Sequence, residues 1–434
     1  MNSSVNATKK KQNQRTGIIY QKSYRLNYKS CMVYTHRFMC ETTEITIVGG
    51  GPTGLYLADL LAKKDIHVTV IEQHKTIGSP VHCAGLITPR VFEQFQISSE
   101  NIIQNSISTA QIHSPNNKTL TIGGDKIHAY SIDRKKFDRT IANQAEQNGT
   151  TIINGEKVQS IQRVESHIET CTNKKRNIHS KAIVGADGPQ SLVRDVFCFP
   201  APQKFLKGIG ATLTDTSLDP STVEIFVGNK VAPAFFAWII PTNKKGTTAR
   251  AGLCVPFDQS PKPFFEQFLK NKATTPFIEH ATIENQMAGL IPLGPLKQTS
   301  DDGVLLVGDA AAQVKPTSGG GIFTGLTCAQ IASQTLLSAT QTQNYSKQIL
   351  TKYHTQWKKT IGRELSIGMK LHGLYSKFSD TQFNTYIEKF NNPKLNETIN
   401  KYGDIDYPSK LIKPMLKHTP SLLKLIPGLI HVKK

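Results

Sequence analysis

The sequence predicts an α/β fold, or α+β over the whole chain, with a doubly wound region that is interrupted by an antiparallel β-sheet and followed by helices. Three observations predict it. An apolar strand, a glycine-rich turn and an amphipathic helix follow one another from residue 44. Strand-like runs fill residues 196–300, and the first pattern returns after residue 303 before a mostly helical region. This order is typical of a parallel sheet that is split by a second domain.

The first βαβ unit is predicted from two changes of periodicity. Residues 45–48 form an apolar run, residues 55–64 carry leucines at helical spacing, and residues 66–71 are rich in β-branched side chains. Two such runs on either side of an amphipathic helix are the pattern of two parallel strands and their crossover helix.

The remaining elements are predicted from the same periodicities. Helical spacing follows Asp133 as far as Gly149, whereas residues 151–180 alternate as antiparallel strands do. The other predicted elements are strands at 182–185, 222–227, 235–240, 247–255 and 303–307, and helices at 263–270, 321–339, 357–375 and 380–390.

These elements divide the chain into four regions. Residues that precede the first strand are compatible with a transit peptide, or with a translated upstream region before a start at Met32 or Met39. The regions are a basic N-terminal extension, predicted to be disordered, at 1–43; a discontinuous nucleotide-binding domain at 44–195 and 301–340; a substrate-binding sheet domain at 196–300; and a C-terminal helical region with a basic tail at 341–434.

The charge of the chain is concentrated at its ends. The net charge of the 434 residues is +20, but residues 1–40 contain eight Lys/Arg and residues 409–434 contain six, in both cases without an acidic residue. The body of the protein carries only +6, so no nucleic-acid partner is expected. Apolar residues are mixed with the lysines of the last segment, which suits peripheral contact with anionic lipid; a docked end with solvated lysines is the alternative. Pro408, Pro414, Pro420 and Pro427 are expected to break this tail into single turns.

Cysteine usage and hydropathy indicate the cellular compartment of the protein. The seven cysteines include no Cys-x-x-Cys pair, so neither a disulfide framework nor a metal site is expected. No apolar run approaches the ~18 residues of a membrane-spanning helix. We therefore expect a cytoplasmic protein, with peripheral contact at the inner face of the cell membrane.

The glycine-rich turn predicts a dinucleotide site. Gly49, Gly51 and Gly54 form a G-x-G-x-x-G between strand and helix, in which they permit the tight turn, the approach of a pyrophosphate and close helix packing, respectively. Glu72 ends the second strand about twenty residues later, where an acid binds ribose hydroxyls. An ordinary glycine-rich turn is the alternative.

Two later motifs specify the dinucleotide. The segment Gly185-Ala186-Asp187-Gly188 resembles the Asp-Gly segment of the flavoprotein hydroxylase and reductase superfamily, and residues 307–311 with Gly319-Gly320-Gly321 resemble its Gly-Asp segment. Residues 132–138, which include Arg134, are similar to the stretch before the helix that flanks FAD. The resemblance implies a Rossmann-like FAD-binding domain and FAD as the cofactor.

Physical arguments agree with these assignments. Asp309 follows a buried strand and is placed to bind a ribityl hydroxyl, and the triple glycine lets backbone approach the isoalloxazine ring. The helix that begins near Ile322 directs its positive end to the reduced flavin. A simple cap is the alternative role for Asp309, and an ordinary turn is the alternative for Asp187.

Within that superfamily, three segments resemble the geranylgeranyl reductase family. They are Pro80-Val81-His82-Cys83-Ala84-Gly85-Leu86, Phe236-Ala237-Trp238-Ile239-Ile240-Pro241 and residues 316–322. Ile240 stands where the family usually has Phe. The likeness covers residues 44 to about 375 and is greatest to archaeal members that reduce the geranylgeranyl chains of ether lipids.

The resemblance implies hydrogenation of isolated prenyl double bonds by a hydride from flavin N5 and a proton. Positive charge then develops on the alkene, and an aromatic wall stabilises such charge. Phe235, Phe236 and Trp238 are candidates for this wall, although strand alternation places Phe235 on the opposite face, and core packing is their alternative role. Cys83, which the family places near the flavin, is a candidate proton donor or flavin modulator, with a small buried cysteine as the alternative.

The predicted partners are a prenyl lipid and an external electron donor, either ferredoxin or NADPH, since no second nucleotide motif is visible. A flavin hydroxylase that uses NAD(P)H and oxygen, and a flavin electron-transfer protein, are the alternative functions. The predicted site residues are Cys83, Phe236 and Trp238 for catalysis, and Gly49, Gly51, Gly54, Glu72, Arg134, Asp187, Asp309, Gly319, Gly320, Gly321 and Ile322 for cofactor binding.

Overall fold

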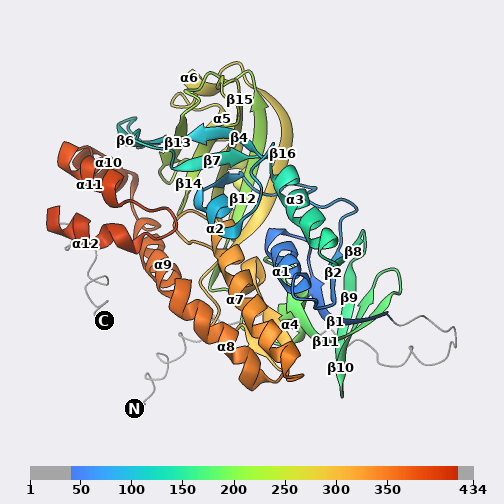
Figure 1. The fold of residues 1–434 in the computed structure, drawn as a ribbon. Helices are drawn as coiled ribbons and strands as arrows, with labels where there is room; N and C mark the ends of the chain where they lie inside the picture. Colours follow the sequence, from blue (N-terminus) through green and yellow to red (C-terminus); the bar gives the residue numbers. More distant parts are fainter. Residues whose placement is uncertain (1–40, 419–434) are drawn as a thin grey trace, which may run out of the picture. The chain divides into compact units, whose positions relative to one another are not determined.

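A mostly parallel sheet forms the centre of the nucleotide-binding part of the protein (Figure 1). The computed structural model describes residues 41–418. The strands run, in spatial order, β17 (Ser300–Asp301), β18 (Val304–Leu306), β11 (Asn177–Gly185), β1 (Glu41–Val48), β2 (Val68–Glu72) and β8 (Thr151–Asn154), while β9 (Val158–Val164) and β10 (His167–Thr172) extend the sheet beside β11.

Both faces of this sheet are covered, which explains why its strands are continuous apolar runs. On β18 and the residue after it, Leu305 and Val307 point to one core, and Val304 and Leu306 point to another. Figure 1 shows the helices that build the first core together in front of the sheet. They are α1 (Pro52–Ala62), α3 (Arg134–Gln147), α7 (Ile322–Gln341) and α8 (Lys347–Trp357).

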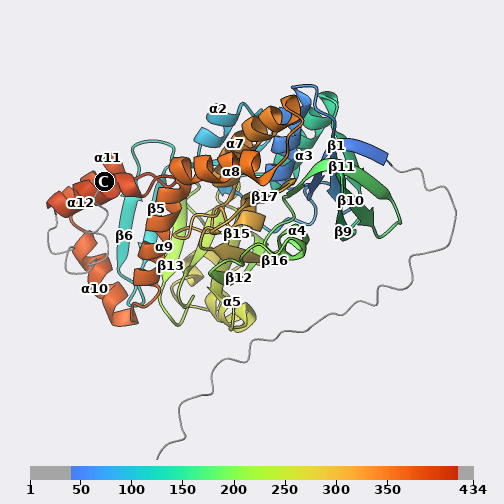
Figure 2. The ribbon, with the colours of Figure 1, turned by 90° about the horizontal axis from the view of Figure 1, so that it is seen from below.

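A second, seven-stranded sheet takes its strands from two parts of the sequence. Two short helices, α5 (Pro261–Leu269) and α6 (Thr275–Ile278), pack on one of its faces, and Figure 2 shows α5 against β12. The strand order is β16 (Thr282–Leu293), β12 (Lys204–Thr214), β15 (Thr248–Pro256), β14 (Phe236–Pro241), β13 (Thr222–Val227), β5 (Thr109–His113) and β6 (Thr119–Gly123).

The segment that precedes α3 connects the two sheets. It contains α2 (Arg90–Phe95) and a small sheet of β3 (Leu86–Ile87), β7 (Ala129–Ile132) and β4 (Ile103–Ile107). The hairpin β5–β6 then pairs with β13 of the larger sheet in parallel. Residues 109–123 therefore lie in the same sheet as strands from residues 204–293, and the domain boundary at residue 195 stays a prediction.

The C-terminal region is helical as predicted, with one difference. A π-helical turn at Lys358–Gly362 joins α8 to α9 (Arg363–Tyr375), and α10 (Asp380–Phe390), α11 (Pro393–Tyr402) and α12 (Ser409–His418) follow. Proline was expected to break the tail into single turns, but α12 continues through Pro414. Proline removes one hydrogen bond without preventing a helix of this length.

The terminal predictions fall partly outside the described structure. The first strand begins at Glu41, three residues before the predicted domain boundary, and the rest of the N-terminal extension lies outside the described residues. Residues 419–434 of the basic tail also lie outside them. Within residues 41–418, no helix is both long enough and apolar enough to cross a membrane.

Candidate active site

The glycine-rich turn connects β1 to α1 in a conformation that its glycines permit. A Cβ at Gly49, where φ is +106°, would lie 2.3 Å from the Ala186 carbonyl oxygen, and a Cβ at Gly54 would lie 2.4 Å from the Gly49 oxygen. A Cβ at Gly51 would meet nothing within 4 Å. Two glycines are therefore required by the fold, and Gly51 faces open space at the N-terminus of α1, where a phosphate finds free N–H groups.

Glu72 fixes this turn from the end of β2. Its carboxylate accepts a hydrogen bond from the Gly50 amide at 2.7 Å, and it also accepts from the His74 amide at 2.8 Å. The His74 ring lies 2.6 Å from the same carboxylate. Both His74 contacts are made to one carboxylate oxygen, whereas the oxygen that accepts from Gly50 keeps a further lone pair. That oxygen is compatible with the predicted binding of a ribose hydroxyl.

Asp187 lies beside the same turn, because β11 pairs with β1 as far as Gly185. One of its oxygens accepts a hydrogen bond from the Val193 amide at 3.1 Å, at the start of α4 (Leu192–Val196). The other oxygen is buried without a hydrogen-bond partner among the described residues. Burial raises the pKa of Asp187, although its hydrogen bonds oppose that shift. A buried acceptor without a partner favours a ligand group at this position.

Asp309 and the triple glycine lie together at the N-terminus of α7. A Cβ at Gly321 would lie 2.9 Å from an Asp309 carboxylate oxygen, and a Cβ at Gly319 would lie 2.9 Å from Ile291 on β16. A φ of +70° at Gly319 and these close contacts therefore already favour glycine at the two positions, in addition to any approach by a flavin. Burial raises the pKa of Asp309 to about 6, although the charge of Arg134 opposes the shift.

Arg134, the first residue of α3, connects the acidic groups to Cys83. Its guanidinium donates two hydrogen bonds to Asp138, at 3.1 and 2.9 Å. Burial opposes its charge, but Asp138 and then Cys83 more than offset that effect and raise the pKa of Arg134. The Arg134 side chain therefore already interacts with Asp138 and Cys83, and its charge opposes the rise in the pKa of Asp309.

Two guanidinium groups, those of Arg134 and Arg250, interact with Cys83. Arg250, on β15, donates a hydrogen bond to the Ala84 carbonyl at 2.9 Å and interacts electrostatically with Cys83. Burial, together with the charge of Arg134, lowers the pKa of Arg250, while Cys83 opposes this shift. The Gly85 amide donates to the Cys83 sulfur at 3.3 Å. This environment distinguishes Cys83 from Cys254, whose pKa burial raises to about 12.

The three aromatic residues form one cluster, which corrects the prediction from strand alternation. The rings of Phe235 and Phe236 are stacked with centroids 4.3 Å apart, and Trp238 meets Phe236 edge-on at 6.0 Å. Phe235 precedes β14 and follows Ala234, which has a φ of +60°, so it does not obey the alternation of the strand. The chain reverses at this point and returns Phe235 to the face of its neighbours.

The aromatic cluster lies against both the Cys83 segment and the glycine loop. Trp238 packs in one apolar cluster with Ala84 and Leu86, and a Cβ at Gly319 would lie 3.6 Å from the Phe235 ring. His82, one residue before the cysteine, has its Nδ1 atom 2.8 Å from the Ala288 carbonyl oxygen on β16. The structure therefore brings the Cys83 segment, the aromatic cluster and the glycine loop together at one face of the larger sheet.

Two residues of this site were not among the predicted ones. Arg250 and Gly252 lie on β15 and share a face with Trp238, whose cross-strand partner is Gly252. A Cβ at Gly252 would lie 2.6 Å from the indole ring, so glycine makes room for it. A single arginine within the apolar run at 248–256 is the signal that was available in the sequence.

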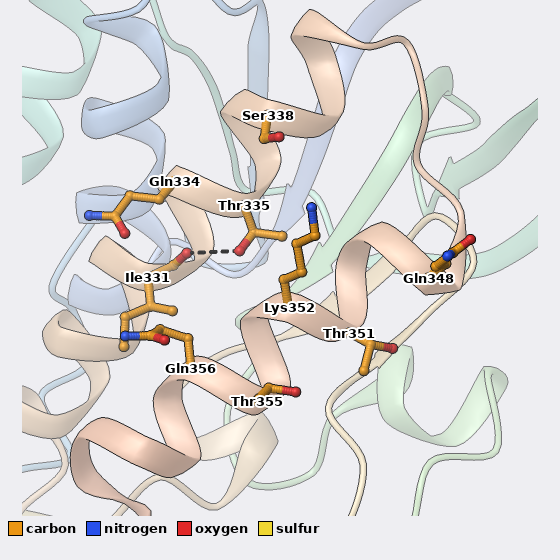
Figure 3. Close-up of a pocket in the computed structure, with 9 residues that line it drawn as sticks. All are labelled: Ile331, Gln334, Thr335, Ser338, Gln348, Thr351, Lys352, Thr355 and Gln356. Atoms are coloured by element: carbon orange, nitrogen blue, oxygen red, sulfur yellow. Dashed lines mark hydrogen bonds between the residues drawn. The ribbon is translucent and has the colours of Figure 1, made fainter.

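Other features of the described residues lie apart from these side chains. A groove of about 600 Å³ lies between α7 and α8. Its lining side chains, which are mainly polar, are labelled in Figure 3. His167, Glu169 and His179, on β10 and β11, hold potential metal-ligating atoms within 4.8 Å of one another, whereas the sequence predicts no metal site. Neither feature includes a predicted site residue.

The arrangement fits FAD. The open space beside Gly51, the unpartnered oxygen of Asp187 and the buried carboxylate of Asp309 lie along one edge of the parallel sheet, at the carboxyl ends of β1, β11 and β18. Ligands of doubly wound folds bind at this edge. Fold and site together define a flavoprotein of the hydroxylase and reductase type.

Comparisons with known proteins agree with this class. The FAD-binding domain family matches residues 42–363. A digeranylgeranylglycerophospholipid reductase of Methanocaldococcus jannaschii is 30% identical over 405 residues, which cover 91% of this chain and 100% of that protein. The corresponding reductase of Methanococcus vannielii is 28% identical over the same shares. The chain therefore belongs to the digeranylgeranylglycerophospholipid reductase family of FAD-dependent oxidoreductases.

Solved structures confirm the fold. A geranylgeranyl bacteriochlorophyll reductase-like protein of Thermoplasma acidophilum has a TM-score of 0.79 at 20% identity and covers 90% of this chain and 100% of its own. The p-nitrophenol 4-monooxygenase of Pseudomonas putida has a TM-score of 0.67 at 18% identity and covers 86% of this chain and 98% of its own. Reductases and monooxygenases thus share this architecture.

Proposed function

We propose that this protein hydrogenates isolated double bonds in the geranylgeranyl chains of an ether phospholipid or of geranylgeranyl diphosphate. The membership of the family supports the reaction class. The observation that carries the proposal is the convergence of Cys83, the aromatic cluster and the glycine loop on one face of the larger sheet. Apolar and aromatic side chains suit a prenyl chain, which offers no polar group along its length.

The residues of the site have separable roles in this proposal. When bound, reduced FAD supplies the hydride from its N5 atom. Gly51 and the N-terminus of α1 bind the pyrophosphate, and Glu72 and Asp309 bind hydroxyl groups. Phe236 and Trp238 exclude water and stabilise positive charge on the alkene through their ring faces.

In this proposal, the proton that is added to the alkene comes from the Sγ atom of Cys83. Transfer of the proton to the alkene carbon leaves a thiolate, and Arg134 and Arg250 are placed to stabilise that negative charge. A proton from solvent then restores the Cys83 thiol, and the two electrons that each reduction consumes come from an external donor, ferredoxin or NADPH. We further propose that the enzyme works in the cytoplasm at the inner face of the cell membrane, where its lipid substrate is located.

The proposal is tested by anaerobic reoxidation of the flavin. FAD-loaded protein is reduced with dithionite, mixed with a detergent-solubilised geranylgeranyl phospholipid, and followed by the absorbance of oxidised flavin. We expect reoxidation with the unsaturated lipid and none with the saturated lipid. Reoxidation only after admission of oxygen, with substrate-dependent oxygen uptake in the presence of NAD(P)H, would instead identify a hydroxylase.

A further inference from the structure

A cavity of about 710 Å³ lies between the C-terminal helices and the segment around α2. Its walls are the start of α2, the turn before β7, the end of α11 and the middle of α12. Figure 1 shows α11 beside β6, with α12 next to α11. We call this cavity the basic pocket, because six of its lining side chains are Arg90, Lys126, His128, Lys401, Lys410 and Lys413.

Among the described residues, acidic side chains pair with three of these six basic groups and leave three lysines unpaired. The His128 ring lies 3.0 Å from Asp125. Asp404 binds Arg90 at 3.0 Å and Lys410 at 2.8 Å. Burial alone would raise the pKa of Asp404, but the hydrogen bonds from Arg90 and Lys410 lower it to about 2. Among residues 41–418, Lys126, Lys401 and Lys413 have no carboxylate within ion-pair distance, and Glu93 is the only other acid of the lining.

Apolar side chains surround these lysines at the surface. Ile127, Tyr402 and Ile405 line the basic pocket and are 46%, 40% and 46% exposed. They are three of the six large apolar side chains that are exposed in the described part of the chain. Exposed apolar groups beside unpaired lysines are the composition of surfaces that enter the interface of an anionic membrane.

We propose that the basic pocket binds the phosphate group of an anionic phospholipid. Lys126, Lys401 and Lys413 attract the phosphate, and Ile127, Tyr402 and Ile405 contact the first carbons of the lipid chains. A free phosphate would use only the lysines, whereas a lipid uses both sets of side chains. This inference rests on the proposed function, because the substrate of that function is itself a lipid.

The basic pocket is joined to the predicted flavin site by buried polar contacts. Arg90 donates a hydrogen bond to Asp406 at 2.7 Å, and Asp406 accepts another from Lys315 at 2.6 Å. Lys315 begins the segment that ends in the triple glycine, and its amide donates to the Gly320 carbonyl at 3.1 Å. Arg90, Asp406 and Lys315 therefore connect the basic pocket to the glycine loop at residues 319–321, where a prenyl chain would react.

The test measures vesicle binding by the full-length, FAD-loaded protein without turnover. Sedimentation is compared for phosphatidylcholine vesicles with and without phosphatidylglycerol. The variant carries Lys126→Gln, Lys401→Gln and Lys413→Gln. The matched control carries Lys244→Gln, Lys245→Gln and Lys262→Gln, which changes the net charge equally at exposed positions outside the pocket. FAD content and the unfolding temperature verify that each protein is folded.

We expect the pocket variant to lose vesicle affinity by about tenfold or more, and the control variant by less than about threefold. A second variant, Ile127→Ser with Ile405→Ser, should also weaken vesicle binding without changing the weak binding of glycerol phosphate. Equal losses in the two lysine variants would overturn the proposal. So would unchanged vesicle binding in the apolar variant. A pocket variant that keeps its affinity for vesicles but loses affinity for a single-stranded oligonucleotide, measured in parallel, would also overturn it. Because no substrate is turned over, these outcomes are independent of prenyl reduction.

Discussion

Cys83 is the residue whose chemistry depends most on its surroundings. Its two charged neighbours come from different parts of the chain, Arg134 from the start of α3 and Arg250 from β15. Buried Cys254 and Cys328 have raised pKa values because of burial, which makes them poor proton donors. Cys83, in contrast, is partly exposed and interacts with two guanidinium groups.

Replacing Cys83 tests its role in proton transfer. We expect Cys83→Ala to lower the turnover of a prenyl lipid by about 10²-fold or more, because general acids typically contribute 10²–10⁴-fold. FAD content should stay unchanged, since the thiol is not among the groups assigned to the cofactor. The matched control is Cys198→Ala, at an exposed cysteine. Unchanged turnover in Cys83→Ala would remove this residue from the mechanism.

At the residue scale, the sequence predicted positions that belong to local motifs and missed those that depend on strand pairing. Gly49 and Gly54 follow from the spacing of a single turn, and the close contacts that an added Cβ would make at each position agree with that prediction. The roles of Gly252 and Arg250 could not be predicted from the spacing of a local motif. Their positions beside Trp238 and Cys83 depend on the register between β14 and β15, which local periodicity does not encode.

The turn between β1 and α1 separates structural from ligand-binding glycines. Gly54 packs against the Gly49 oxygen, whereas the space beside Gly51 is open. Gly51 is the N-cap of α1 with a φ of −77°, which other residues adopt without strain. The two positions therefore respond differently to the same added methyl group.

Alanine substitutions at these positions give a paired prediction. We expect Gly54→Ala to lower the free energy of unfolding by about 2 kcal/mol or more, because the backbone must shift to admit the methyl group. Gly51→Ala should change the stability of the FAD-free protein by less than about 1 kcal/mol and weaken FAD binding by at least about tenfold. Urea unfolding and FAD titration measure the two effects. Normal FAD affinity in Gly51→Ala would place the pyrophosphate elsewhere.

At the element scale, most strongly periodic segments are correctly predicted, and the strands with weak patterns are missed. The strand at 222–227 and the helix at 380–390 agree with β13 and α10 to the residue. In contrast, β12 contains Gly208 and Gly210, and β16 contains Gly289 and Pro292. These residues are unfavourable in isolated strands, and β16 is an edge strand whose first residues are exposed.

At the scale of the whole molecule, the chain between α11 and α12 is anchored to the segment that begins at Lys315 and ends in the triple glycine. The Asp406 side chain is fully buried and receives hydrogen bonds from Lys315, Arg90 and Thr88, at 2.6, 2.7 and 2.7 Å. These donors are distant in sequence, so Asp406 connects the C-terminal helices to two parts of the nucleotide-binding fold. Sequence patterns gave no indication of this contact, because it joins isolated polar residues across more than ninety positions.

Removal of the Asp406 charge tests this connection. A buried pair that loses one partner leaves an uncompensated charge, so we expect Asp406→Asn to lower the free energy of unfolding by about 3 kcal/mol. FAD binding should weaken as well, because Lys315 positions the glycine loop. Thermal unfolding and FAD titration are the measurements, with exposed Asp258→Asn as the control. Equal stability of the two variants would show that the contact is unimportant.

The reduction of prenyl double bonds is tested most directly by the mass of the lipid product. FAD-loaded protein, kept reduced with dithionite under anaerobic conditions, is incubated with an unsaturated archaeal-type ether phospholipid, and the lipid is analysed by mass spectrometry. We expect each reduced double bond to add two hydrogens to the lipid, and we expect Cys83→Ala to slow their appearance. If FAD-loaded protein leaves the mass of every prenyl substrate unchanged, it does not reduce prenyl double bonds.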